Sequence, residues 1–259
     1  MYFNITKRKA GYGNFKKRIN LRTILLLYFF AMSPLITISQ PVDLGTWNLL
    51  NVKYNHSAEL SLFGEGQLRS LSFFDQFHYY EIKGGFNYLI HKSVLLTLGA
   101  GSYQTYREGG NLQTPKNNNE FRLWPQILLL QQINNFKIDQ RYRSEMRWTS
   151  KGYRNRFRYR AGVSLPFGNE NNGYKPFQVS LSNELFFTDN EPYFERNRIQ
   201  LALNYKLSKS STIQLGYLHQ FDYKINDETG RDFLVVGYYF ELFRNSESKS
   251  ESENQLLEN

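Results

Sequence analysis

The stretch DQRYRSEMRWTSKGYRNRFRYRAG, residues 139–162, carries seven arginines in 24 residues, interleaved with tyrosine, phenylalanine and tryptophan. Charged and apolar residues alternate in it with a period of two, which is the period of side chains in a β-strand. The charged residues that share a face are Asp139, Arg141, Arg143, Glu145 and Arg147 in one segment, and Arg154, Arg156, Arg158 and Arg160 in the next. The stretch therefore predicts two strands, each with a charged face and an apolar face.

Arginine beside aromatic residues is also typical of nucleic-acid-binding proteins, but there both residue types share one accessible face. Here they lie on opposite faces. The formal net charge of +9 is also uneven, because residues 1–39 hold seven Lys and Arg and no acid, which leaves +2 for residues 40–259. We therefore expect no nucleic-acid partner.

The N-terminal segment has the form of a secretory signal peptide. A basic stretch is followed by the apolar run ILLLYFFAMSPLI, residues 24–36, and then by a polar end with small residues. An N-terminal anchor helix is the alternative, but the run is interrupted by Pro34 and is shorter than the roughly 20 residues that a spanning helix needs. We predict a signal peptide over residues 1–39 and a mature chain from about Gln40.

The rest of the chain repeats the alternation of period two in segments of the length that a tilted bilayer-crossing strand needs. Ten such strands fit residues 58–243, and GTWNLLNVKY (45–54) is an eleventh candidate. Since bacterial single-chain barrels have even strand numbers, either a strand is missed or residues 45–54 do not simply add to the wall. The predicted fold is all-β: a single antiparallel transmembrane β-barrel of about 10–12 strands over residues 40–243, followed by a disordered polar tail (244–259).

The connections and the aromatic residues extend this prediction. Short connections at residues 91–93, 134–135 and 208–211 are expected to alternate with longer ones, among them SLSFFDQ (70–76), as periplasmic turns alternate with extracellular loops; PFGNENNGYKP (166–176) is a long connection where a turn is expected. Aromatic residues make up 17% of the chain. The tyrosines expected in girdles at the two membrane interfaces are Tyr79, Tyr80, Tyr103, Tyr106, Tyr153, Tyr217 and Tyr238.

The chain also resembles a known family on the segments GTWN near the start, EFRLWPQ (120–126), QRYRSEMR (140–147), RFRYRAG (156–162), SNELFF (182–187) and ERNRIQLALNYKLS (195–208). These segments resemble the outer-membrane β-barrels gathered as domain of unknown function 2490, which is common in Bacteroidota. The resemblance implies a signal peptide, a barrel in the outer membrane and no assigned activity.

The candidate site is the charged inner face of the predicted barrel. Its residues are Glu120, Arg122, Asp139, Arg141, Arg143, Glu145, Arg147, Arg154, Arg156, Arg158, Arg160, Glu184 and Arg198. An unpaired buried charge is costly, so these residues are expected to pair across a narrow lumen. The two hypotheses are a structural network of ion pairs and a narrow conduit for small anionic solutes.

A membrane-embedded enzyme acting on lipid or lipopolysaccharide is the alternative function. Such enzymes use a histidine as a base, and His78 and His219, both expected on the lipid-facing side, are the candidates. Without a nucleophile motif we favour a non-enzymatic protein over an enzyme, and we predict no metal and no cofactor. A third class is an adhesin or receptor that binds through its outer loops. The expected partners are outer-membrane lipids and, during biogenesis, the barrel-assembly machinery.

Overall fold

The computed structural model describes residues 44–170, 173–223 and 229–244. Every regular element in these ranges is a strand, and none of them contains a helix long and apolar enough to cross a membrane. The strands are β1 (Gly45–Asn55), β2 (Leu60–Ser72), β3 (Asp75–His91), β4 (Val94–Tyr106), β5 (Lys116–Ile133), β6 (Phe136–Thr149), β7 (Gly152–Phe167), β8 (Phe177–Thr188), β9 (Phe194–Lys206), β10 (Ser211–Asp222) and β11 (Thr229–Phe243). The predicted signal peptide (1–39) and nearly all of the predicted tail (245–259) lie outside the described residues.

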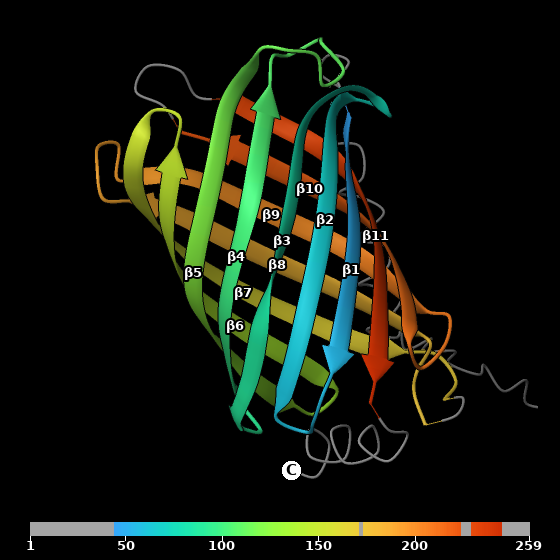
Figure 1. Ribbon diagram of the computed structural model, residues 1–259. Coiled ribbons are helices and arrows are strands. Elements are labelled where there is room, and N and C mark those ends of the chain that lie inside the picture. Colours follow the sequence, from blue (N-terminus) through green and yellow to red (C-terminus); the bar gives the residue numbers. More distant parts are fainter. Residues whose placement is uncertain (1–43, 171–172, 224–228, 245–259) are drawn as a thin grey trace, which may run out of the picture. The chain divides into compact units, whose positions relative to one another are not determined.

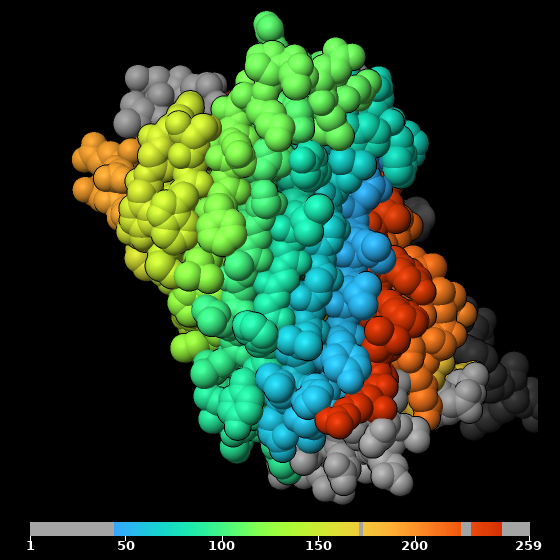
Figure 2. Space-filling view, in the orientation of Figure 1, coloured from blue at the N-terminus to red at the C-terminus, as the bar shows by residue number. Residues whose placement is uncertain are grey.

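The strands form one closed barrel in which each strand pairs with its neighbours in the sequence (Figure 1). All consecutive pairs are antiparallel, and the barrel closes where β11 pairs with β1 in parallel over residues 45–55 and 233–243. In the space-filling view the red side chains of β11 lie directly beside the blue ones of β1, as a continuous wall (Figure 2). No strand of the barrel has a free edge, which is the condition that a sheet in lipid must meet.

The prediction of an all-β barrel of 10–12 strands is confirmed, but two details of it are wrong. Residues 45–55 are a full wall strand, although they make the strand number odd. The barrel is also not wholly antiparallel, because with eleven strands the first and the last run in the same direction and must pair in parallel. The expectation of an even strand number came from bacterial barrels in general, and odd barrels such as the 19-stranded mitochondrial channel are known.

Because side chains alternate between the faces of a strand, each strand contributes one apolar face and one polar face. Leu50, Ile82, Phe86, Leu201 and Leu215 are among the many large apolar residues exposed on the outer surface. The buried residues of the inner face are largely polar or charged. Two apolar clusters interrupt it: Trp47, Leu218, Phe233 and Val235 form one, and Tyr79, Tyr103 and Trp124 form the other. Within the second cluster a side chain at Gly99 would collide with the Trp124 ring, so this position needs a glycine.

We call the barrel end at which β1 begins the N-side and the end at which β11 finishes the C-side; the N-side is uppermost in Figure 1. The connections depart from the expected alternation. SLSFFDQ is not a long loop, because β2 and β3 are joined by the two-residue turn Phe73–Phe74 on the N-side. The connection between β7 and β8 lies on the C-side, the end of the short turns, as the sequence predicts for PFGNENNGYKP (166–176). Connection length therefore does not distinguish the two ends.

The parallel closure makes a register-specific prediction. Val52 and Phe240 are Cα partners across the β1–β11 pair, and the chain has no natural cysteine. Neighbouring strands bring Cα atoms within the range that a disulfide spans. The double variant Val52→Cys, Phe240→Cys should therefore form an intrachain disulfide under mild oxidation, detected as a shift in gel mobility that is reversed by reduction.

The control is Val52→Cys with Val236→Cys. Val236 pairs with Asn48, so it lies four residues away along β11, which at about 3.3 Å per residue is roughly 13 Å and too far for a disulfide. Cross-linking of the control pair, or none in the Val52–Phe240 pair, would contradict this register.

Candidate functional site: an arginine–glutamate network in the barrel lumen

The structure places all thirteen predicted lumen residues on the inner face, on β5, β6, β7, β8 and β9. They are brought together because neighbouring strands align their charged faces. Glu145 on β6 is the Cα partner of Arg156 on β7, and Glu184 on β8 is the partner of both Arg160 on β7 and Arg198 on β9. The alternation that is visible in the sequence thus becomes a belt of facing charges.

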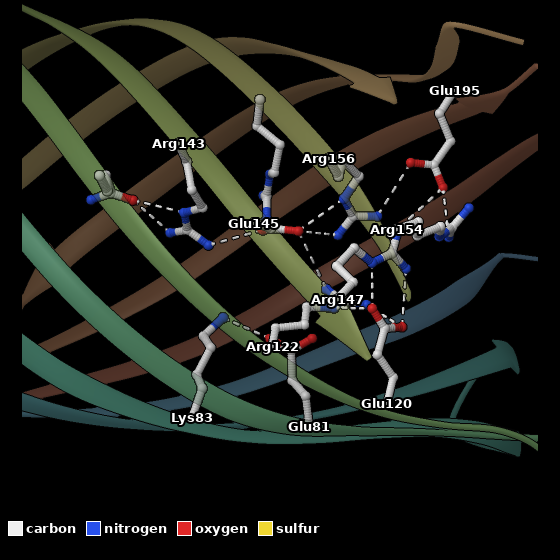
Figure 3. Close-up of polar contacts among 12 residues, drawn as sticks. Glu81, Lys83, Glu120, Arg122, Arg143, Glu145, Arg147, Arg154, Arg156 and Glu195 are labelled. Carbon is white, nitrogen blue, oxygen red and sulfur yellow. Dashed lines mark hydrogen bonds and ion pairs between the residues drawn. The ribbon is translucent and has the colours of Figure 1, made fainter. Parts of the chain in front are cut away.

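Glu145 is the centre of this belt and is fully buried. Its Oε2 accepts from Nε and Nη2 of Arg156, at 2.9 and 2.6 Å, and its Oε1 accepts from Nη1 of Arg158 at 2.7 Å. Arg143 at 3.6 Å and Arg122 at 3.9 Å complete a shell of four guanidinium groups (Figure 3). One carboxylate therefore holds cations from three strands.

Two more glutamates extend the network toward the N-side (Figure 3). Glu120 accepts from Arg122, at 2.7 Å, and from Arg147. Glu195 lies 3.3 Å from Arg154, and its other neighbours are Arg147 at 3.6 Å and Arg156 at 3.5 Å. Arg147 and Arg156 thus link Glu195 to the groups around Glu120 and Glu145.

The network continues toward the C-side with Glu184 and Asp139. Glu184 accepts from Arg141 at 2.6 Å and from Nε and Nη2 of Arg158 at 3.0 and 2.9 Å. Asp139 accepts from Arg160 at 2.7 Å. Arg158 is shared by Glu145 and Glu184, so the central and C-side parts are one connected network.

Arg198 differs from the other predicted cations. Among the described residues it forms no ion pair; its Nε donates to Gln220 at 2.9 Å, and its guanidinium lies 4.8 Å from the Trp47 ring and 4.7 Å from the Phe186 ring. Trp47 is covered on another side by Arg69, at 3.4 Å. Contacts between cations and aromatic rings therefore take the place of a carboxylate here.

Sequence reasoning missed Glu195 and the aromatic members of the site. Glu195 is absent from the predicted lumen residues; β9 begins at Phe194, and a β-bulge there sets Glu195 out of the regular pairing. Tyr79 and Tyr103 were expected in a girdle, yet both are buried inside against Trp124. The only signal in the sequence for an inward orientation was the period of two, since Tyr79 and Tyr103 each lie two residues from an inward-facing position, Glu81 and Gly101.

Two cavities lie inside the barrel, one toward each end, and share part of their lining. The N-side vestibule has a volume of about 660 Å³ and the C-side vestibule about 640 Å³. The residues that line both cavities are Trp47, Gln67, Lys83, Arg158 and Arg198, which we call the dividing layer. Because Glu145 is fully buried between arginines of this region, charged and aromatic side chains fill the middle of the barrel.

The two candidate histidines lie on different faces. His78 was expected to face lipid, but a β-bulge beside Arg69 and Ser70 leaves it out of the pairing, and its side chain lines the N-side vestibule. His219 does lie on the outer face, where its Nδ1 is 2.7 Å from Asp232 and Tyr217 donates to the same carboxylate oxygen. Within the described ranges, no group of three or more His, Cys, Asp or Glu residues is placed to hold a metal ion.

The network predicts a large and specific effect of removing its central charge. Glu145→Gln keeps the shape of the side chain but leaves four arginines around a neutral amide, so it should lower the free energy of unfolding by about 3–5 kcal/mol. The measurement is urea unfolding of the detergent-folded barrel, followed by tryptophan fluorescence and by the heat-dependent shift in gel mobility.

The matched control is Glu108→Gln. Glu108 pairs with Arg231 at 2.6 Å at the N-side end, where its side chain is 60% exposed. An exposed pair contributes about 0–1 kcal/mol. Equal effects of the two substitutions would show that the network has no special part in stability.

A model of a protein family described as "Protein of unknown function (DUF2490)" matches residues 44–231, which begin at the start of β1 and extend into β11. Searches of curated proteins and of solved structures found no match. The resemblance seen in the sequence segments is thereby confirmed, and the chain belongs to the DUF2490 family.

Proposed function

We propose that this protein is an outer-membrane β-barrel whose lumen is closed in the middle by the arginine–glutamate network. The observation that carries the proposal is the dividing layer, which separates two polar vestibules inside a barrel with an apolar outer surface. Such a molecule acts as a non-enzymatic membrane protein that offers a pocket to each side of the bilayer. It is not built as a continuously open pore.

Three features support the membrane location. The strands are 11–18 residues long, which meets the 9–11 residues that a tilted strand needs to cross a bilayer. The outer surface is apolar, and exposed aromatic residues lie near both ends of the barrel. At the N-side these are Phe73, Phe74, Trp148, Tyr153 and Tyr193, and at the C-side Tyr88, Phe136, Phe167 and Tyr205. Two such bands are typical of the aromatic girdles at the membrane interfaces.

The location predicts how the protein fractionates. The full chain, expressed in a Gram-negative host, should be recovered in the outer-membrane fraction and should run faster on a gel without heating than after boiling. Partners that follow from the location are the lipids of that membrane and, during insertion, the barrel-assembly machinery. Recovery of the folded protein in the soluble fraction would contradict the proposal.

The closed lumen predicts electrical behaviour. The wild-type barrel, verified as folded, should show no steady conductance in planar bilayers, because the dividing layer blocks the path between the vestibules. Arg198→Ala should give a measurable steady current, since Arg198 lines both vestibules and among the described residues forms no ion pair whose loss would unfold the barrel. A steady wild-type current would show that the lumen is a conduit.

A second candidate function is favoured by one observation, the His219–Asp232–Tyr217 cluster on the lipid-facing surface near the N-side. A carboxylate that holds Nδ1 of a histidine orients the ring and leaves Nε2 to act as a base. The open space beside this ring is provided by Gly230, where a side chain would come within 3.2 Å of it. The cluster is therefore arranged to activate water against an ester of a membrane lipid.

This function has its own test. Purified protein in mixed micelles of phospholipid or lipopolysaccharide should release fatty acid, and His219→Gln should abolish the release while leaving the fold intact. His78→Gln is the control, because that histidine lines the interior. No release by the wild type, or equal release by His219→Gln, would rule out this activity.

A further inference from the structure

The C-side vestibule carries more positive than negative charge. Among the described residues, eight Lys or Arg and four Asp or Glu line it. The acids are Glu65, Asp139, Glu184 and Glu241. An excess of cations in a cavity of limited size attracts anions from solution and favours their binding.

The excess is concentrated on β6 and β7. Arg141 and Arg160 are Cα partners across these strands, and so are Arg143 and Arg158. Like charges directly opposite each other destabilise a sheet unless a counter-charge lies between them. Of the carboxylates that line the vestibule, Glu184 contacts Arg141 and Arg158, and Asp139 contacts Arg160. Arg143 and Arg158 also contact Glu145, which is shared with Arg122 and Arg156.

The hydrogen-bonding capacity of these arginines is not filled. The Nη2 of Arg141 donates to Glu184, and the Nη2 of Arg160 donates to Asp139. The Nε of each arginine is buried and has no hydrogen-bond partner among the described residues. Arg143 donates from Nε and Nη2 to the oxygen of Gln126, which is a neutral amide. Guanidinium groups hydrogen-bond most strongly to carboxylate and phosphate, and part of this capacity is not used on this face of the cavity.

The rest of the wall has a different chemistry. Besides the charged Glu184, Arg198 and Lys206, strands β8, β9 and β10 line the same cavity with a group of neutral polar side chains, among them Ser180, Gln200, Asn204 and Gln214. These hydrogen-bond to one another, for example from Gln214 Nε2 to Asn204 Oδ1 at 2.9 Å. Amides and hydroxyls suit the hydroxyl groups of a ligand and not a second charge.

We propose that the C-side vestibule binds a small organic phosphate, with its dianionic group against Arg141, Arg143 and Arg160 and its hydroxylated part against the neutral wall. A dianion matches the excess of positive charge among the residues that line the cavity. The volume of about 640 Å³ accommodates a ligand of sugar-phosphate size. The inference goes beyond the closed lumen, because it concerns one vestibule and holds whether or not the barrel conducts.

The test uses two variants that break the same ion pair. Arg160→Gln removes a ligand of the phosphate, so it should weaken the binding of glucose 6-phosphate at least tenfold. Asp139→Asn removes the carboxylate that competes with the phosphate for Arg160, so it should strengthen binding several-fold. Isothermal titration of the detergent-folded full chain measures both, and Arg231→Gln, in the other vestibule, should leave the affinity unchanged.

Opposite shifts support the site, because a merely structural pair would respond in the same direction to both substitutions. Shifts in the same direction, no binding of glucose 6-phosphate by the wild type, or glucose binding as tightly as its phosphate would each overturn the proposal. Inorganic phosphate should bind more weakly than glucose 6-phosphate, and equal affinities would overturn the part assigned to the neutral wall.

A second measurement does not touch the charged residues. Ser182 lines the C-side vestibule and Asn190 the N-side vestibule. With Ser182→Cys, glucose 6-phosphate should slow labelling by a maleimide, and with Asn190→Cys it should not. Equal protection of both cysteines, or protection of neither, would contradict the assigned site.

Discussion

The rest of the structure depends on a carboxylate that is buried among guanidinium groups. A closed barrel with an apolar outer surface must turn its polar side chains inward, and here these include many arginines. Away from bulk water an unpaired charge is costly, and contact with opposite charges offsets that cost. Glu145 supplies the opposite charge for arginines of β5, β6 and β7 at once. Arg158 contacts both Glu145 and Glu184 and so connects these two carboxylates. The ion pairs thereby fix the positions of neighbouring strands as well as filling the lumen.

The closure of the wall and the filling of the lumen are connected through β1. This strand pairs antiparallel with β2 and parallel with β11, and it brings the buried Trp47 opposite Arg69. Trp47 packs edge-on against Phe233 of β11 and is covered by Arg69 and Arg198. An even barrel without β1 would lack the aromatic ring that holds two cations at the dividing layer. The eleventh strand is therefore part of the interior as well as part of the wall.

Much of this structure could be predicted from the sequence, since both the strand and its inner face follow from a period of two. That rule placed Arg141, Glu145 and Arg158 correctly on the inner face. The rule failed where a bulge interrupts the period of two. The bulges at His78 and Glu195 each displace one side chain, and no residue type in the sequence predicts them. The rule also gave no partner for any charge, because the contact of Glu145 with Arg156 depends on strand register. The parallel pairing of β1 with β11 could not be predicted either, because the alternation within a strand does not show which distant strand it pairs with or in which direction.

The closed middle and the positive C-side vestibule have one cause. Carboxylates are concentrated around the dividing layer, where Glu120, Glu145 and Glu184 each hold two or more arginines. Toward the C-side the arginines of β6 and β7 continue, but Asp139 is the carboxylate left to pair with Arg160. An anion that entered from this side would meet the arginines of β6 and β7 first and then a layer in which Lys83 and Arg158 each contact two carboxylates. To pass, it would have to displace Glu184 or Glu145 from bonds of 2.6–2.7 Å to Arg141, Arg156 and Arg158. In the proposed function, the same charge distribution that attracts an anion into the vestibule would stop it there, which is the property of a binding pocket and not of a channel.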